Sequence, residues 1–400
     1  MGLRVVEIFE GDVGPEAPAL VRALAALGVT VEVACPPEAV ARFADTGAVA
    51  VTGVGGVTGV PTLRRMVRPA EPGAPDAEGG RRVDVLHAHG LRAGLSASLA
   101  RTGSTPLVLS WFHPPRPAAH GVAPGALVGW ALARTVVPAA AVVLAATPTL
   151  VESATRLGAG DVRLVQPPVL DLPALSRTAE QVYEELALDP RGPLILAEGR
   201  LHPESRHEVL IEAAARWRYR LPLPQVVIVG VGPAYRDLVA RATVARAPVT
   251  FAGERFFTPQ APHAPGAGVS AADPPDEQLP RSPVDDEERA SLVDLIRAAD
   301  VAVVTAETAR PFFALAAAQC GLPLVVPAEG QVAHLLGAAA AHVAPGSHEV
   351  DALDAAVRHL LDDASARAKL ADAALLQSRQ WPSVAEVADG LLELYQGLAG

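Results

Sequence analysis

The stretch that decides the fold passes from an apolar strand through a polar loop into a helix: Ile195-Leu196-Ala197-Glu198-Gly199-Arg200-Leu201-His202-Pro203-Glu204-Ser205-Arg206-His207-Glu208-Val209-Leu210-Ile211-Glu212-Ala213. The apolar run 194–197 has the length of a buried strand, and the apolar spacing from Val209 onward is typical of a helix. Strand, loop and helix in this order form the repeating unit of a parallel α/β sheet. The loop holds Arg200 and Arg206 but no lysine, and the only lysine of the chain is Lys369.

The same alternation extends along the whole chain. Strands are predicted at 4–9, 30–35, 83–87, 107–112 and 142–146, with helices such as 17–27 and 94–100 between them. After a polar connection near 172–184, a second set of strands is predicted at 194–197, 225–229, 249–251, 301–304 and 324–326. The chain has 400 residues, 50% of them hydrophobic, which is enough for two cores. The pattern therefore predicts an α/β protein with two Rossmann-like domains, each binding ligands beyond the carboxyl ends of its strands.

Charge and cysteine content exclude several classes of protein. The net charge is −11 and the arginines are scattered, which disfavours binding to nucleic acid. Cys35 and Cys320 lie far apart and are predicted to be free thiols in a reducing compartment, so we expect a cytoplasmic protein.

The most apolar region, 126–151, is interrupted by Arg134 and Pro138, so no transmembrane segment is expected. The first residues form the strand predicted at 4–9 and do not have the charged and then apolar pattern of a leader, so no secretory signal is expected.

Two segments rich in Pro, Gly and acidic residues, 69–80 and 258–288, break the alternation. Neither segment is expected to form core, and 258–288, which has almost no large apolar residues, is predicted to be a disordered or loosely packed insertion. The second follows the segment Phe251–Glu254. For this insertion we favour a surface excursion over a substrate lid.

Several motifs together resemble GT-B glycosyltransferases of the GT4 kind. They are Gly199-Arg200-Leu201 with the helix Leu210–Ala213, Asp84-Val85-Leu86-His87-Ala88-His89-Gly90, Gly230-Val231-Gly232-Pro233, and Gln380-Trp381-Pro382-Ser383. The resemblance implies two facing Rossmann-like domains with parallel sheets. An acceptor-side domain would span 1–175 and a domain that binds the nucleotide sugar would span 176–378. A C-terminal helix within 379–400 would cross back to pack on the N-terminal domain.

The resemblance also implies a set of site residues. His113 would face the reacting sugar and Glu307 would contact it, whereas Arg200, with help from Arg206, would hold the donor diphosphate. These side chains suit the roles: the guanidinium of an arginine can bind two phosphate oxygens at once, and the neutral imidazole of a histidine can hydrogen-bond a sugar hydroxyl. The remaining predicted donor-binding residues lie in glycine-rich turns or at a helix N-terminus: Gly14, Gly232, Phe312 and Phe313.

The chain departs from the family at charged positions. Ser205 occupies the usual lysine position, and Arg206 stands where the family has glycine. Arg206 either supplies the missing charge or is a solvated arginine at the start of a helix. No acid lies between Glu307 and Glu329, so the carboxylate that binds the nucleotide ribose is missing. Loss of one charge-assisted hydrogen bond weakens binding by roughly ten- to a hundredfold.

His87 and His89 point the same way on a strand, an arrangement that also occurs in metal sites. With no further ligand cluster nearby in sequence, we interpret them as structural histidines and expect no metal ion. No cofactor is expected apart from the nucleotide-sugar substrate. Pyridoxal phosphate is disfavoured because Lys369 lies in a C-terminal helical segment.

The resemblance therefore predicts a retaining, metal-independent glycosyltransferase of the hexosyltransferase type. It would move a sugar from a nucleotide-diphosphate donor to an unidentified acceptor. The alternative is a catalytically degenerate GT-B protein that acts as a binding or scaffolding subunit for a protein partner. The missing lysine and the missing ribose carboxylate motivate that alternative.

Overall fold

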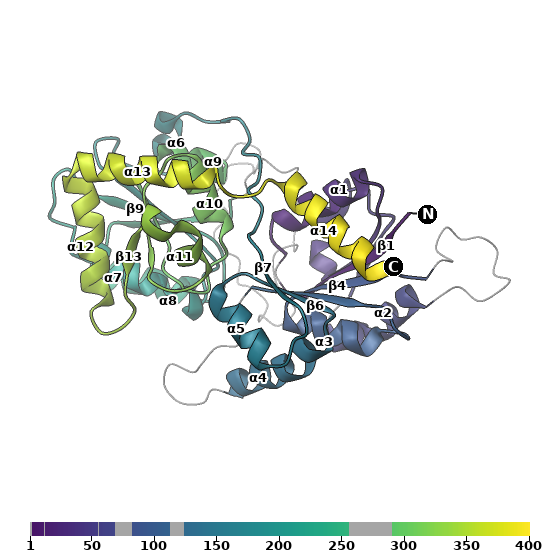
Figure 1. The fold of residues 1–400 in the computed structure, drawn as a ribbon. Helices are drawn as coiled ribbons and strands as arrows, with labels where there is room; N and C mark the ends of the chain where they lie inside the picture. The colour runs from purple at the N-terminus through teal and green to yellow at the C-terminus, as the bar shows by residue number, and fades with distance from the viewer. Residues whose placement is uncertain (1, 12, 55, 69–81, 113–123, 256–289) are drawn as a thin grey trace. The chain divides into compact units, whose positions relative to one another are not determined.

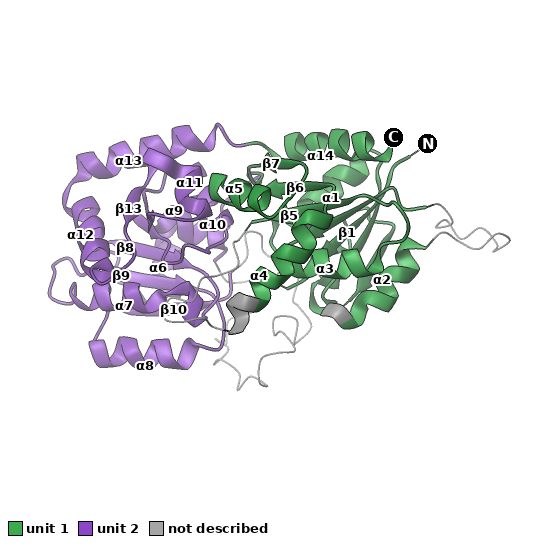
Figure 2. Ribbon diagram, turned by 60° about the horizontal axis from the view of Figure 1, so that its bottom comes forward, with its two compact units in different colours: residues 1–168, 266–270, 382–400 green, residues 169–265, 271–381 purple. Residues whose placement is uncertain are grey.

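The computed structural model describes residues 2–11, 13–54, 56–68, 82–112, 124–255 and 290–400. The chain divides into two compact units, coloured separately in Figure 2. Unit 1 contains the described residues up to Pro168 together with Pro382–Gly400, and unit 2 contains those from Val169 to Trp381. The domain limits predicted from sequence, 175 and 378, differ from these divisions by a few residues. Val169, Leu170 and Leu172 pack against the core of unit 2, which explains why the division falls before them.

Unit 1 is built on a seven-stranded parallel sheet in the order β3-β2-β1-β4-β5-β6-β7 (Figure 1). Its strands are β1 Arg4–Phe9, β2 Thr30–Cys35, β3 Ala50–Gly53, β4 Val85–His89, β5 Leu107–Trp111, β6 Val142–Ala145 and β7 Val162–Leu164. Strand β4 lies two residues later than predicted, because its ladder with β1 continues to the pair Phe9 and His89. The central strands are almost fully buried, as expected for a parallel sheet covered on both faces.

Helices cover both faces of this sheet. They are α1 Glu16–Ala26, α2 Val60–Val67, α3 Leu91–Ala100, α4 Pro124–Val136, α5 Pro148–Arg156 and the C-terminal α14 Val384–Ala399. Helices α1 and α14 pack together over one core, and α2, α3 and α4 cover the other. Helix α14 begins with a capping box between Ser383 and Glu386 and buries Tyr395 completely. The last helix of the chain is thus part of the first unit.

Unit 2 is a second doubly wound structure with a six-stranded parallel sheet in the order β10-β9-β8-β11-β12-β13. Its strands are β8 Leu194–Glu198, β9 Gln225–Val229, β10 Val249–Gly253, β11 Val301–Val303, β12 Leu324–Pro327 and β13 Ala341–Val343. Its helices are α6 Ala179–Glu185, α7 His207–Ala215, α8 Tyr235–Ala245, α9 Leu292–Ala298, α10 Phe312–Gln319, α11 Gln331–Leu336, α12 Glu349–Asp362 and α13 Ala364–Ser378. Helices α7, α8 and α12 cover one face, and α9, α10 and α13 cover the other.

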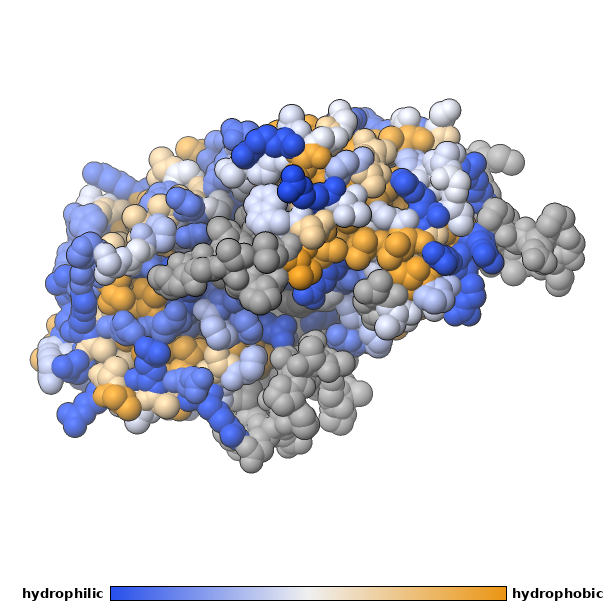
Figure 3. Space-filling model, turned by 90° about the horizontal axis from the view of Figure 1, so that it is seen from below, coloured by the Kyte–Doolittle hydropathy of each residue, from blue (hydrophilic) through white to orange (hydrophobic). Residues whose placement is uncertain are grey.

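The surface combines polar and apolar side chains. Leu99 in α3 and Val128 and Trp130 in α4 are exposed, and the side of the molecule seen in Figure 3 shows apolar surface interspersed with hydrophilic side chains. Among the residues that the structure describes, no helix has the length and apolar character needed to cross a bilayer.

Candidate functional site

The strand order of unit 2 reverses between the adjacent parallel strands β8 and β11, because later strands are added on one side of β8 up to β10 and on its other side from β11 onward. Strand β8 leads into α7 on one face of the sheet, and β11 leads into α10 on the other. At such a switch point the loops separate and leave a crevice beyond the carboxyl ends of the strands. Arg200 and Arg206 follow β8 and Glu307 follows β11, so the fold brings these predicted site residues to the same edge of one sheet.

Three glycines let the loops at this edge pack closely. A Cβ on Gly230 would lie 2.0 Å from the carbonyl oxygen of Gly199, and one on Gly330 would lie 2.1 Å from that of Glu307. Both have positive φ, 142° and 99° respectively, which disfavours any other residue. At the predicted donor-binding residue Gly232, an added Cβ would lie 2.4 Å from the carbonyl oxygen of Leu201. Glycine at these positions therefore holds the loops around the crevice in fixed contact.

Hydrogen bonds fix the loop after β8. Ser205, at the lysine position, donates its Oγ to the carbonyl oxygen of Arg200 at 2.5 Å. Thr305, after β11, donates its Oγ1 to the carbonyl oxygen of Ser205, also at 2.5 Å. The hydroxyl of Ser205 is thus used inside the loop, whereas the side chain of Arg200 is exposed. The predicted phosphate ligand Arg200 stands on a loop that is tied to both strands of the switch point.

Arg206 adopts a left-handed backbone conformation, with φ 56° and ψ 30°. Glycine takes this conformation without strain, which agrees with glycine at this position in the resembled family. Its Nη2 forms an ion pair with Oε2 of Glu349, the first residue of α12. The side chain of Arg206 is 35% exposed and that of Glu349 only 9%. Sequence reasoning missed Glu349, because nothing in the local pattern links it to a loop far earlier in the chain.

His207, the first residue of α7, is a second residue that sequence reasoning missed. It is buried, and its Nδ1 lies 3.5 Å from Oγ1 of Thr305. Burial lowers the pKa of His207 to about 4, against a weaker opposing effect of the Gly199 backbone. The imidazole is therefore neutral at physiological pH and supports the loop rather than adding a positive charge. The sequence feature that could have identified it is a histidine at the start of an otherwise apolar helix.

The other predicted residues of unit 2 lie around the N-terminus of α10. Glu307 is half-buried in the loop that leads from β11 to this helix. The side chains of Phe312 and Phe313 are buried in the core, so only their backbone N–H groups remain for a ligand. The N-cap residue Pro311 makes no side-chain capping hydrogen bond, and the N–H groups of a first helical turn attract anions.

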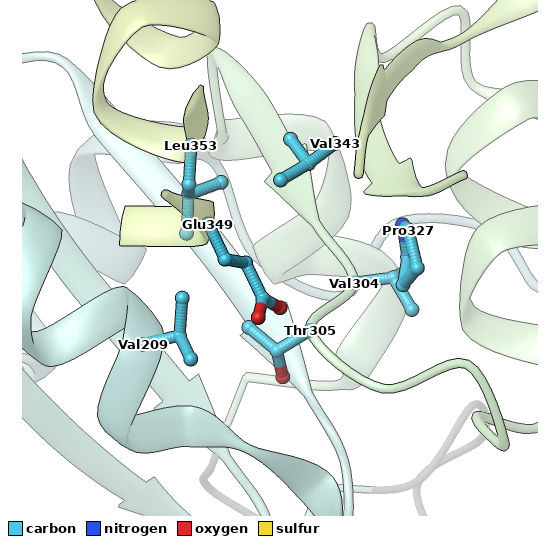
Figure 4. A pocket seen from close by; sticks show the side chains of 7 residues that line it. All are labelled: Val209, Val304, Thr305, Pro327, Val343, Glu349 and Leu353. Atoms are coloured by element: carbon cyan, nitrogen blue, oxygen red, sulfur yellow. The ribbon is translucent and has the colours of Figure 1, made fainter. Parts of the chain in front are cut away.

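A small cavity lies beneath the loops of this edge (Figure 4). Its lining combines apolar side chains with Thr305 and Glu349, and the Glu349 carboxylate points toward Thr305. Its volume of about 10 Å³ accommodates about one water molecule. The cavity is too small for a sugar or nucleotide, so a ligand of unit 2 would have to bind outside it, above the carboxyl ends of the strands.

In unit 1, the predicted residue Gly14 is buried at the start of α1. Arg42 donates Nη1 to the carbonyl oxygen of its neighbour Val13 at 2.6 Å, which orders this turn. His113, the predicted residue for the reacting face, lies outside the described residues, as do the insertions 69–80 and 258–288. The roles assigned to Gly14 and His113 stay predictions.

His87 and His89 belong to a buried network that sequence reasoning did not foresee. Glu7 on β1 lies beside His87 in the ladder, and its Oε2 is 2.7 Å from Nε2 of His89 and 3.2 Å from Nδ1 of His87. Tyr395 of α14 donates to Oε1 of Glu7 at 2.9 Å and lies 2.5 Å from Nδ1 of His87, whose Nε2 is 2.8 Å from Oγ of Ser110. Although burial opposes ionisation, the two histidines hold the pKa of Glu7 well below its usual range.

Glu7, His87 and His89 have the chemistry of metal ligands, and their ligand atoms lie within 4.8 Å of one another. Around a tetrahedral zinc ion with bonds of about 2.0–2.1 Å, ligand atoms are about 3.3 Å apart. The 2.7 Å between Glu7 and His89 is the length of a direct hydrogen bond, and His87 is also engaged by Ser110. As arranged, the cluster is a hydrogen-bonded network that joins α14 to the sheet of unit 1.

Comparisons with known proteins agree with the fold and with the N-terminal unit. Residues 11–169 match a family model described as a glycosyl transferase 4-like domain. The structure is similar to HepE from Anabaena, solved in complex with UDP and glucose, with a TM-score of 0.68 at 16% identity over 99% of this chain and 100% of that one. It is also similar to sucrose-phosphate synthase from Thermosynechococcus elongatus, with a TM-score of 0.69 at 17% identity over 99% of each chain. A glycosyltransferase from Rickettsia africae gives a TM-score of 0.69 at 12% identity over 99% of this chain and 98% of that one. None of the curated protein sequences matches the chain. The predicted GT-B fold and the resemblance to GT4-type glycosyltransferases are confirmed.

Proposed function

We propose that this GT-B chain, whose N-terminal unit matches a glycosyl transferase 4-like domain, is a glycosyltransferase that uses a nucleotide-diphosphate sugar. The observation that carries the proposal is the edge of unit 2 between β8 and β11. There the loop bearing Arg200 is tied by hydrogen bonds to Thr305, and α10 begins without a side-chain cap. Guanidinium and helix N–H groups together form an anion site suited to a diphosphate.

In the proposed reaction the bond between the anomeric carbon and the diphosphate oxygen breaks. The acceptor oxygen bonds to the same carbon, and its proton passes to the leaving diphosphate oxygen. Arg200 stabilises the negative charge that develops on the leaving diphosphate, and Glu307 contacts the sugar. We propose retention of the anomeric configuration and no catalytic metal ion, because the family that the motifs resemble works in this way. Product anomers identified by NMR, and turnover in the presence of EDTA, test these two points.

The first test is calorimetric titration of the full-length protein with UDP, GDP, ADP and dTDP. UDP comes first because the similar HepE structure contains UDP. We expect saturable binding of one nucleotide, weakened roughly ten- to a hundredfold by Arg200→Ala through loss of a charge-assisted contact. Arg191→Ala is the matched control. Arg191 is exposed, precedes the N-terminal end of β8 and pairs with Asp189, so it lies at the end of the strand opposite to Arg200. Equal affinities of the wild type and Arg200→Ala would contradict the placement of the diphosphate.

The second candidate function is a degenerate GT-B subunit that binds a protein partner. Two observations favour it: the hydroxyl of Ser205 is used inside its own loop, and no acid lies between Glu307 and Glu329 for the ribose. No binding of any nucleotide at millimolar concentration, together with stable copurification of a partner, would support this function. Transfer or hydrolysis of a nucleotide sugar by the isolated protein would exclude it.

A further inference from the structure

The structure shows Arg206 held in place from two sides. Its backbone occupies the left-handed region, which costs a non-glycine residue free energy, and its guanidinium pairs with Glu349. Among the described non-glycine residues only Ala187 and Arg246 share a positive φ. A strained backbone with a fixed side chain points to a task for that side chain.

Glu349 is suited to hold a guanidinium. It begins α12, its side chain is 9% exposed, and it lines the small cavity with Val209, Val304 and Leu353 (Figure 4). A carboxylate in such apolar surroundings needs a charged partner, because an unpaired buried charge is very unfavourable. Arg206 is the partner that the structure records, so the carboxylate restricts the guanidinium to this place.

The pair lies at the carboxyl edge of the sheet of unit 2. Arg206 follows β8 and stands between Ser205 and His207, which both contact Thr305 after β11. Glu349 follows β13 and lines the small cavity together with Thr305. A guanidinium carries five N–H donors in a planar fork, and Nη2 is the nitrogen that faces Glu349. Because 35% of the Arg206 side chain is exposed, its remaining donors can meet a ligand from solvent.

We propose that Glu349 is a positioning residue that holds Arg206 at the crevice, where the guanidinium binds a donor phosphate oxygen in place of the missing lysine. This inference rests on the proposed function. An arginine that is already fixed loses less conformational freedom when it binds an anion than a freely rotating one. The Glu349 carboxylate thereby increases nucleotide affinity although it carries the same sign of charge as the phosphates.

A double-mutant cycle tests the inference by calorimetric titration with UDP, using the full-length protein. Arg206→Gly suits the left-handed backbone and is expected to weaken binding roughly ten- to a hundredfold. Glu349→Ala frees the arginine and is expected to weaken binding about two- to tenfold. In the Arg206→Gly background, Glu349→Ala should change the affinity by less than about twofold, because its effect passes through the arginine.

Two further variants complete the experiment. Arg246→Gly removes the other left-handed arginine, at the end of α8, and is expected to leave UDP affinity unchanged. Glu349→Gln keeps an acceptor for Arg206 and should fall between the wild type and Glu349→Ala. Circular dichroism confirms that each variant is folded before its affinity is compared.

The outcomes separate this inference from the proposed function. If Glu349→Ala weakens binding equally in both backgrounds, its role is structural and the inference is wrong. If Arg206→Gly binds UDP as well as the wild type while Arg200→Ala does not, the inference is wrong and the proposed donor site stands. If the wild type binds no nucleotide, both are wrong.

Discussion

The buried imidazole of His207 predicts a specific loss of stability in mild acid. Its pKa in the folded protein is about 4, compared with 6.5 for an unburied histidine, because burial penalises the charged form. Well above pH 6.5 the imidazole is neutral in both states and contributes nothing to the pH dependence. As the pH falls below 6.5, the unfolded chain takes up a proton that the folded protein does not, so the free energy of unfolding decreases.

The size of this effect follows from the two pKa values. A difference of about 2.5 units corresponds to at most about 3.4 kcal/mol, reached below pH 4. Between pH 7.5 and pH 5.0 the free energy of unfolding is expected to decrease by about 2 kcal/mol. His207→Leu removes the titrating group, so in this variant the free energy of unfolding should fall by about 2 kcal/mol less over the same pH range.

The assay must follow unit 2 separately, because two units can unfold in separate transitions. Wild type and His207→Leu are equilibrated in urea at pH 7.5 and 5.0 and then pulse-labelled with deuterium at one common pH. Mass spectrometry of peptides from α7 and β8 then gives the unfolding midpoints of unit 2. His348→Gln, at a side chain that is 88% exposed, controls for the removal of an imidazole as such. Identical pH dependence in wild type and His207→Leu would refute the reasoning.

Two further predictions concern the packing of each unit. Gly330→Ala would place a Cβ 2.1 Å from the carbonyl oxygen of Glu307 at a φ of 99°, and should destabilise unit 2 by about 2 kcal/mol or more. Gly346→Ala, at a φ of 130° with no atom within 4 Å of the new Cβ, isolates the backbone strain, and equal thermal shifts for the two variants would contradict the steric argument. Tyr395→Phe removes the hydrogen bond to Glu7 and should cost unit 1 about 1–3 kcal/mol, measured by faster hydrogen exchange in α14. Unchanged exchange in α14 would show that the network does not anchor the helix.

The sequence predicts long buried strands well and short edge strands poorly. The strands at 4–9, 30–35 and 225–229 have the predicted bounds, because each is a nearly uninterrupted apolar run. Strands β3, β7 and β13 were missed, since they contain only four, three and three residues and lie at or near sheet edges. Their residues are largely half-buried or exposed, so no apolar pattern marks them.

The site shows a similar limit. Arg200, Arg206 and Glu307 could be assigned to one edge because each lies in the loop that follows a predicted strand, and parallel strands end at a common edge. The left-handed backbone of Arg206 and the ion pair with Glu349 could not be predicted, because both depend on how α12 packs beside α7. The pairing of Glu7 with His87 likewise requires the register between β1 and β4.

The backbone of Arg206 also bears on the choice between the two candidate functions. In a scaffolding subunit the loop after β8 has no phosphate to bind, and glycine at this position would remove the strain at no functional cost. Removing Arg206 alone would leave the Glu349 carboxylate without its charged partner, but an apolar residue at position 349 together with glycine at position 206 would remove both the ion pair and the backbone strain. An anion that binds Arg206 accounts for both the strained backbone and the buried carboxylate. The chain that lacks lysine in this loop has a fixed arginine in the next position, and this arrangement favours a functioning donor site over a degenerate one.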